Sequence, residues 1–279
     1  MATTLKTSIG HNTTDSLSQL QPGALDLSHL PVTRLERMAR AGQEILRWHD
    51  ILHRSGDTVI TSMLADAMQP TAWDHIPAND VVDNTSGSQF FFHLHGEEED
   101  DGGNGHTDHR DIGETGHFHC FQRLKDPEGG MIRFEPVSAA RGHAVAAPAQ
   151  REDGTGIAHL VALGIDAFGL PNRLFTTNRW VTGETWCPAA ELIPQIDAFE
   201  ISHGQPNFIV NQWMTEMIRL FQPQIACLLM ARDQMLKDHG GGKLSPALND
   251  RSIEVTSELP ISVPAQTAAV AAALEQNRS

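Results

Sequence analysis

Two helical segments are predicted near the N-terminus. Between Pro31 and Arg54, apolar residues recur every three to four positions, which is the spacing of one face of an amphipathic helix. A Ser-Gly pair at 55–56 ends this pattern, and a second, shorter helix is expected over residues 57–69, up to Pro70. The first structured part of the chain is therefore expected to be helical.

The middle of the chain has the alternation typical of β-strands. The segments SQFFFHLH (88–95) and GHFHCFQRL (116–124) have a period of two and are rich in aromatic residues. Two further segments, IAHLVALGID (157–166) and NRLFTTNRWVT (172–182), predict a β-hairpin with its turn around Gly169. Four strands are therefore expected between the two helical regions.

Helices return in the C-terminal half. One is expected to start near Pro188, and a longer one covers residues 207–239, with a kink at Pro223 because proline has no backbone N–H to donate. Three glycines at 240–242 stop it. Helices at both ends of an antiparallel meander predict an α+β fold, in which an antiparallel β-sheet or partial barrel packs with N- and C-terminal helices.

These patterns indicate one domain. Residues 1–30 are rich in Thr, Ser and Gln and predict a flexible N-terminal tail. Residues 31–242 are expected to form a single α+β domain. Residues 243–279, with several prolines and an alanine-rich end, are expected to be a peripheral C-terminal tail.

Two His-x-His doublets lie in the first two predicted strands. Side chains at i and i+2 of a strand point to the same face, so His93 and His95 share a face, and so do His117 and His119. If the two strands pair antiparallel, the intervening apolar residues and Cys120 align on the opposite, core-facing side. The four imidazoles then line a common pocket, and Cys120 is not expected to be a ligand.

Clustered imidazoles predict a metal site. Neutral imidazole nitrogens bind Zn, Cu, Fe or Ni strongly, whereas four close histidines without a metal depress one another's pKa and gain little. The alternative is a solvated polar strand face, which a single doublet would favour. Two doublets on adjacent strands favour a metal, and the predicted ligands are His93, His95, His117 and His119.

The segment between the doublets is acidic and rich in glycine. A run of acids is ordinarily a solvated loop. Its functional interpretation is a lid, or a source of a carboxylate ligand, of a hydrogen-bond acceptor for a ligand, or of a proton shuttle. Glu114, three residues before His117, is the best placed candidate, and Glu97, two residues after His95, is the next.

His159 and Arg179 are further candidates. A lone histidine among apolar strand residues is ordinarily a core residue, but the strand that carries His159 can neighbour the doublets, so His159 is a fifth candidate ligand. Arg179 lies close in sequence to Trp180 and Glu184. It can anchor an anionic or polar substrate, or belong to a hairpin held by aromatic packing and one ion pair.

The composition of the chain limits the classes of partner that it can bind and the cellular compartment in which we expect it. The chain of 279 residues has a formal net charge of −15, which argues against binding nucleic acid or anionic lipid surfaces. No apolar run approaches the roughly 20 residues that span a bilayer, and the N-terminus lacks the apolar region of a secretory signal, so we expect a cytoplasmic protein. Three scattered cysteines form no Cys-x-x-Cys pair, and the absence of tyrosine excludes tyrosine ligands and radicals.

Two resemblances concern these motifs. GSQFFFHLHGEEE is similar to the first motif of the cupins, with Gly87, His93, His95 and Glu99 in place, which implies ligands for iron, manganese, nickel or copper. No second cupin motif is present, so this resemblance bears on chemistry more than on fold. GHFHCF and LFTTNRWVTGETW resemble an uncharacterised bacterial family, a domain of unknown function, over residues 93–186 or so. That family implies no catalytic assignment. The resemblance covers the part of the chain that contains His93, His95, His117, His119, His159 and Arg179, which makes these residues candidates as a group.

We therefore expect a metal-dependent oxidoreductase of the oxidase or oxygenase type, with a histidine-rich non-haem iron or copper centre acting on a small molecule. All-nitrogen ligation without thiolate suits iron or copper, since structural zinc sites commonly include cysteine. The alternatives are a zinc-type hydrolase with Glu114 or Glu97 as the base, and a non-enzymatic metal-binding or sensing protein. The apolar helix at 207–236 suggests a homodimer, although core burial explains it equally well.

Overall fold

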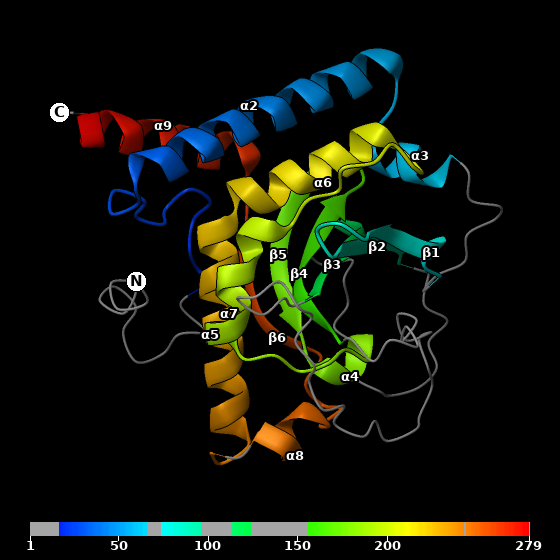
Figure 1. Ribbon diagram of the computed structural model, residues 1–279, viewed down its shortest axis with the longest axis vertical. Helices are drawn as coiled ribbons and strands as arrows, with labels where there is room; N and C mark the ends of the chain where they lie inside the picture. The colour runs from blue at the N-terminus through cyan, green and yellow to red at the C-terminus, as the bar shows by residue number, and fades with distance from the viewer. Residues whose placement is uncertain (1–16, 66–73, 96–112, 124–155, 243, 279) are drawn as a thin grey trace.

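Six antiparallel strands form one sheet, in which the spatial order follows the sequence (Figure 1). The computed structural model describes residues 17–65, 74–95, 113–123, 156–242 and 244–278. The strands are β1 (Ile76–Asp83), β2 (Ser88–Leu94), β3 (Glu114–Arg123), β4 (Ile157–Asp166), β5 (Pro171–Thr177) and β6 (Val255–Pro260). Because β1 and β6 are not paired with each other, the sheet is an open meander rather than a barrel. The predicted α+β class is confirmed.

The helices precede, interrupt and follow the sheet. They are α2 (Val32–Ser55), α3 (Val59–Leu64), α4 (Arg179–Thr182), α5 (Ala189–Leu192), a 3-10 helix (Ile193–Ala198), α6 (Phe208–Leu220), α7 (Gln222–His239), α8 (Leu244–Leu248) and α9 (Val263–Arg278). Helix α2 has the predicted extent, and it ends at Gly56 in a left-handed conformation. No helix within the described segments combines the length and the apolar character needed to cross a bilayer.

The predicted helix over residues 207–239 is two helices. Helix α6 ends at Leu220, and α7 begins at Gln222 with Pro223 in its first turn. A proline is tolerated there because the N–H groups of a first turn have no partner within the helix. The prediction of one kinked helix is therefore wrong, because the helix is interrupted at Phe221 between α6 and α7. Most apolar residues of α6 and α7 are buried in the core, so a homodimer through them stays a prediction.

One face of the sheet carries the main hydrophobic core. Trp213 of α6 lies over Phe118 of β3, with ring centroids 5.6 Å apart, and the Cys120 thiol lies 3.3 Å from the sulfur of Met214. Helix α7 packs against the β4–β6 half of the sheet, while α2 lies alongside α6 (Figure 1). Burial raises the pKa of the Cys120 thiol, which stays protonated in the core. The orientation predicted for Cys120 is confirmed.

The ends of the chain contribute to this core, contrary to the sequence-based expectation. Strand β6 pairs with β5, and α9 packs on α2 so closely that a side chain at Gly42 would overlap Thr267. Leu17 and Leu27 are buried in the core as well, while residues 1–16 lie outside the described part. Helix α9 is rich in alanine, and small residues let two helices approach without a strong apolar pattern, so the sequence pattern did not reveal this contact.

A hydrogen bond between α2 and α6 joins His49 to the core. The indole N–H of Trp213 donates to Nε2 of His49 over 2.9 Å, which requires a neutral acceptor nitrogen. Burial, together with repulsion from His53, lowers the pKa of His49 from 6.5 to about 4. Since unfolded His49 takes up a proton below pH 6.5 and folded His49 does not, its contribution to stability is complete above pH 6.5 and is lost as the pH falls towards 4.

We predict that His49→Gln flattens the acid side of the stability profile. Glutamine keeps an oxygen acceptor for Trp213 but does not titrate. Below pH 6.5, the free energy of unfolding of the variant should fall less steeply than that of the wild type. The difference in slope should reach at most about 1 kcal/mol per pH unit, since partial exposure of the ring weakens the effect of burial. Urea denaturation from neutral pH down to about pH 5 measures both slopes. Parallel profiles would contradict the assignment.

Candidate metal centre

The pairing of β2 with β3 brings the two histidine doublets together. His93 lies directly opposite His117, and Phe91 lies opposite His119. Phe118 and Cys120, on the other face of β3, belong to the main core, whereas Phe91 and Phe121 form a separate small cluster on the histidine side. The predicted antiparallel pairing and the predicted sharing of one face are both confirmed.

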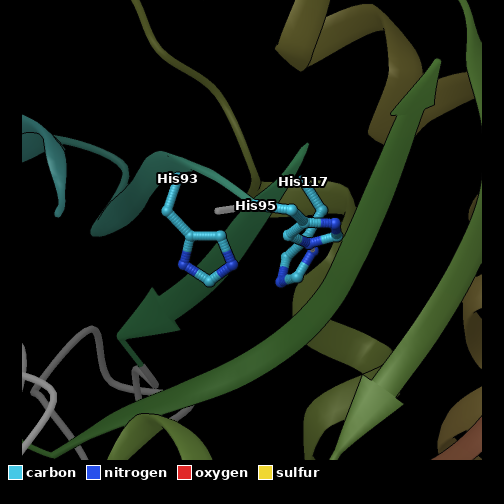
Figure 2. A group of neighbouring side chains, drawn as sticks. All are labelled: His93, His95 and His117. Atoms are coloured by element: carbon cyan, nitrogen blue, oxygen red, sulfur yellow. Dashed lines mark hydrogen bonds between the residues drawn. The ribbon is translucent and has the colours of Figure 1, made fainter. Parts of the chain in front are cut away.

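Three imidazoles form a group that can hold a metal ion. His93, His95 and His117 each offer a ring nitrogen, and these nitrogens all lie within 4.8 Å of one another. Figure 2 shows the rings of His95 and His117 close together, with His93 beside them. The ring centroids of His93 and His117 are 4.0 Å apart, as the directly opposed register requires.

Glu114 adds a carboxylate to this group. Its Oε1 lies 2.9 Å from Nδ1 of His117 and 3.6 Å from Nε2 of His95. The two nitrogens are themselves 2.9 Å apart, so the three atoms form a small triangle. The other oxygen of Glu114, Oε2, accepts two hydrogen bonds from Arg173, from Nε over 3.1 Å and from Nη2 over 2.9 Å. One oxygen of Glu114 is thereby held by Arg173 while the other faces the imidazoles.

The electrostatics of the group favour a bound cation. Burial, and then the neighbouring histidines, lower the pKa of His117 and of His119 well below the usual value, so both rings are neutral near pH 7 and keep a lone pair for a metal. Burial raises the pKa of Glu114 to about 7 against the opposing effect of Arg173. A divalent cation beside Glu114 would favour its ionised form.

His119 and His159 continue the group along the sheet. Nε2 of His119 lies 3.0 Å from Nε2 of His117, and its Nδ1 lies 3.1 Å from Nε2 of His159. Strict alternation along β4 would turn His159 to the same side as Val161, into the core. The register shifts between Cys120 and Phe121, where Leu160 is an extra residue of β4, and this bulge turns His159 to the histidine face. All five predicted histidines therefore lie together, although their roles as ligands stay predictions.

The two other predicted residues are Glu97 and Arg179. Glu97 lies outside the described residues. Arg179 is buried in α4, where its guanidinium donates a hydrogen bond to the side chain of Asn249. Its expected role as a substrate anchor stays a prediction.

Arg173 is the residue that sequence analysis missed. It pairs with Gly164 in the β4–β5 register, and Gly164 in turn pairs with His117, so these residues follow one another across three strands. Besides Glu114, Arg173 binds Glu258 of β6 over 2.7 Å and lies over the Phe175 ring, 4.1 Å from its centroid. Side chains alternate along β5, but this alternation shows that Arg173 is on the histidine face only when the pairing of β3, β4 and β5 is known.

The sequence matches one known protein family over most of its length. The family described as "Domain of unknown function (DUF6969)" matches residues 39–261. The chain belongs to this family. The match confirms the resemblance to an uncharacterised family, and the family's description names no activity. Searches of curated proteins and of solved structures found no significant match. The open sheet differs from a cupin barrel, which limits that resemblance to the first histidine doublet.

Gly164 makes room for the Glu114 carboxylate. A Cβ at Gly164 would overlap Oε2 of Glu114 and lie 2.8 Å from its carboxyl carbon. Glycine is therefore required at this position of β4 by a close approach rather than by a turn.

We predict that Gly164→Ala weakens metal binding by about 10- to 100-fold, because it displaces the carboxylate that faces His95 and His117. Competition with a chromogenic chelator measures the affinity. Gly204→Ala is the matched control, since a Cβ there meets no atom within 4 Å. Thermal melts of both variants report whether the sheet is intact. Unchanged affinity in a folded Gly164→Ala variant would show that Glu114 does not contribute to the site.

Proposed function

We propose that the protein is a metal-dependent oxidoreductase of the oxidase or oxygenase type, with a non-haem iron centre held by His95, His117 and Glu114. The observation that carries this proposal is the triangle of two imidazole nitrogens and one carboxylate oxygen, with sides of 2.9, 2.9 and 3.6 Å. Two histidines and one carboxylate on one face of a metal, with the remaining positions open, are typical of iron(II) oxygenases.

The size of the triangle fits one metal ion. Ligand atoms about 2.1 Å from a metal lie about 3.0 Å apart at a right angle and about 3.4 Å apart in a tetrahedron. The two short sides of 2.9 Å match the first value, and the third side of 3.6 Å lies a little beyond the second. These three residues could therefore hold one ion together.

The surroundings support redox chemistry more than hydrolysis. When bound, iron would supply dioxygen activation, while the chain supplies apolar walls from Phe91 and Phe175, beside His93 and His117 respectively. A zinc hydrolase would need a carboxylate free to act as a base. Glu114, the candidate base within the described residues, has both oxygens engaged, by Arg173 and by the imidazoles. Burial of the site makes a simple surface metal-binding role less suitable.

The ligand set also favours iron over copper. A carboxylate is a harder ligand than imidazole or thiolate, and no thiol of the described residues is seen on this face, because Cys120 points into the core. Copper stays the alternative if the nitrogens alone bind the metal, since a histidine-only site suits it.

Nitric oxide tests the open coordination position. Metal-free protein is loaded with iron(II) without air and exposed to nitric oxide, which binds iron where dioxygen would. We expect a high-spin iron–nitrosyl signal in the electron paramagnetic resonance (EPR) spectrum. It should be lost in His117→Phe and reduced in Glu114→Gln, because each variant removes one ligand of the triangle.

His53→Ala is the control, since it removes an exposed histidine of α2 and should leave the signal unchanged. Protein that binds iron but gives no nitrosyl signal would have a closed coordination sphere and would exclude an oxygenase. Protein that binds zinc but not iron would favour the alternative function of a zinc-type hydrolase.

A further inference from the structure

The His117 ring presents both of its nitrogens to other ligand groups. Nδ1 faces His95 and Glu114, at 2.9 Å from each, and Nε2 lies 3.0 Å from Nε2 of His119. The two nitrogens of an imidazole point away from each other on opposite sides of the ring. One ion therefore cannot bind both, and the proposed iron centre uses only the Nδ1 side.

The Nε2 side of His117 has ligand groups of its own. The His119 ring centroid is 4.7 Å from that of His117, and His93 lies against both, at 4.0 Å from His117 and 5.2 Å from His119. His93 is farther from His95, at 6.0 Å between ring centroids. By position, His93 belongs with the His117–His119 pair as much as with the triangle.

We propose that the chain holds a second metal ion on the Nε2 side of His117, bound by His93, His117 and His119, and joined to the first ion by a bridging His117 imidazole. This inference rests on the proposed function for its first ion. The second set is all nitrogen, so it suits copper, zinc or another borderline divalent metal. Two ions bound to opposite nitrogens of one imidazole lie on the order of 6 Å apart.

His159 supports the second site from behind. With Nε2 of His119 directed at the ion, its Nδ1 keeps the proton and donates it to Nε2 of His159 over 3.1 Å. A histidine ligand that donates its other N–H to an acceptor is held in one tautomer and one orientation. The bulge at Leu160 is what places that acceptor behind His119, so the irregularity of β4 serves this site.

Phenylalanines surround the second site. Phe91 and Phe175 lie at 5.1 and 6.4 Å from the His119 ring centroid, and Phe121 lies at 6.3 Å. His119→Phe therefore keeps an aromatic ring among aromatic neighbours while it removes both ring nitrogens, and a thermal melt of the variant reports whether the fold accommodates the larger ring.

Metal counting tests the inference. Metal-free full-length protein is loaded with copper(II), excess copper is removed by gel filtration, and copper per chain is measured by elemental analysis. We expect two ions per chain in the wild type and in the His53→Ala control, one in His119→Phe, one in His95→Phe, and none in His117→Phe, because His117 is the shared ligand.

The outcomes separate the two proposals. One ion in the wild type, lost in both His95→Phe and His119→Phe, would overturn the second site and leave a single centre. No ion in the wild type would overturn the proposed function as well. Two ions that survive in His119→Phe would also overturn the assignment of ligands.

The EPR spectrum of the wild type gives a test that does not depend on any variant folding. Two copper(II) ions bridged by one imidazole are magnetically coupled, so the integrated signal at low temperature should fall well below the copper content. His119→Phe should restore one full spin per copper ion. Uncoupled copper in the wild type, with a spin count equal to the copper content, would overturn the bridge.

Discussion

The pairing of β2 with β3 in one register is the constraint on which the site depends. Because side chains alternate along a strand, a single register decides whether the four doublet histidines meet or scatter. His93 opposite His117 fixes that register, and it places Phe90, Phe92, Phe118 and Cys120 in the core at the same time. A slip of one residue would turn imidazoles into the hydrophobic core and phenylalanines to the histidine face. Burial of the apolar residues on one face therefore fixes the register that brings the histidines together on the other face.

The two faces of the sheet have different physical tasks. The core side is covered by α6 and α7 and supplies stability through apolar burial. The histidine side gathers polar groups that are buried and mutually repulsive when charged, which lowers the pKa of His117 and His119. Such a concentration of neutral imidazoles around a carboxylate costs free energy unless each group finds a partner, and a metal ion is the partner that satisfies several at once.

The sequence pattern was sufficient where local periodicity governs the structure. It predicted α2, the four central strands, the common face of the doublets and the core-facing side chain of Cys120, because each of these follows from spacing within one or two elements. It was insufficient where pairing between distant strands decides. The side taken by His159 depends on a bulge in β4, and the approach of Arg173 to Glu114 depends on registers across β3, β4 and β5. The packing of the alanine-rich α9 on α2 had no strong periodic signal.

X-ray absorption at the metal edge tests the central claim, that imidazoles from β2 and β3 bind a metal together, most directly. For protein loaded with iron or copper, the account predicts a nearest shell of nitrogen and oxygen at about 2.0–2.2 Å, with the outer-shell scattering of imidazole rings. It also predicts that this imidazole scattering diminishes in His95→Phe. A shell of sulfur at about 2.3 Å, or a shell of oxygen without imidazole scattering, would contradict the account.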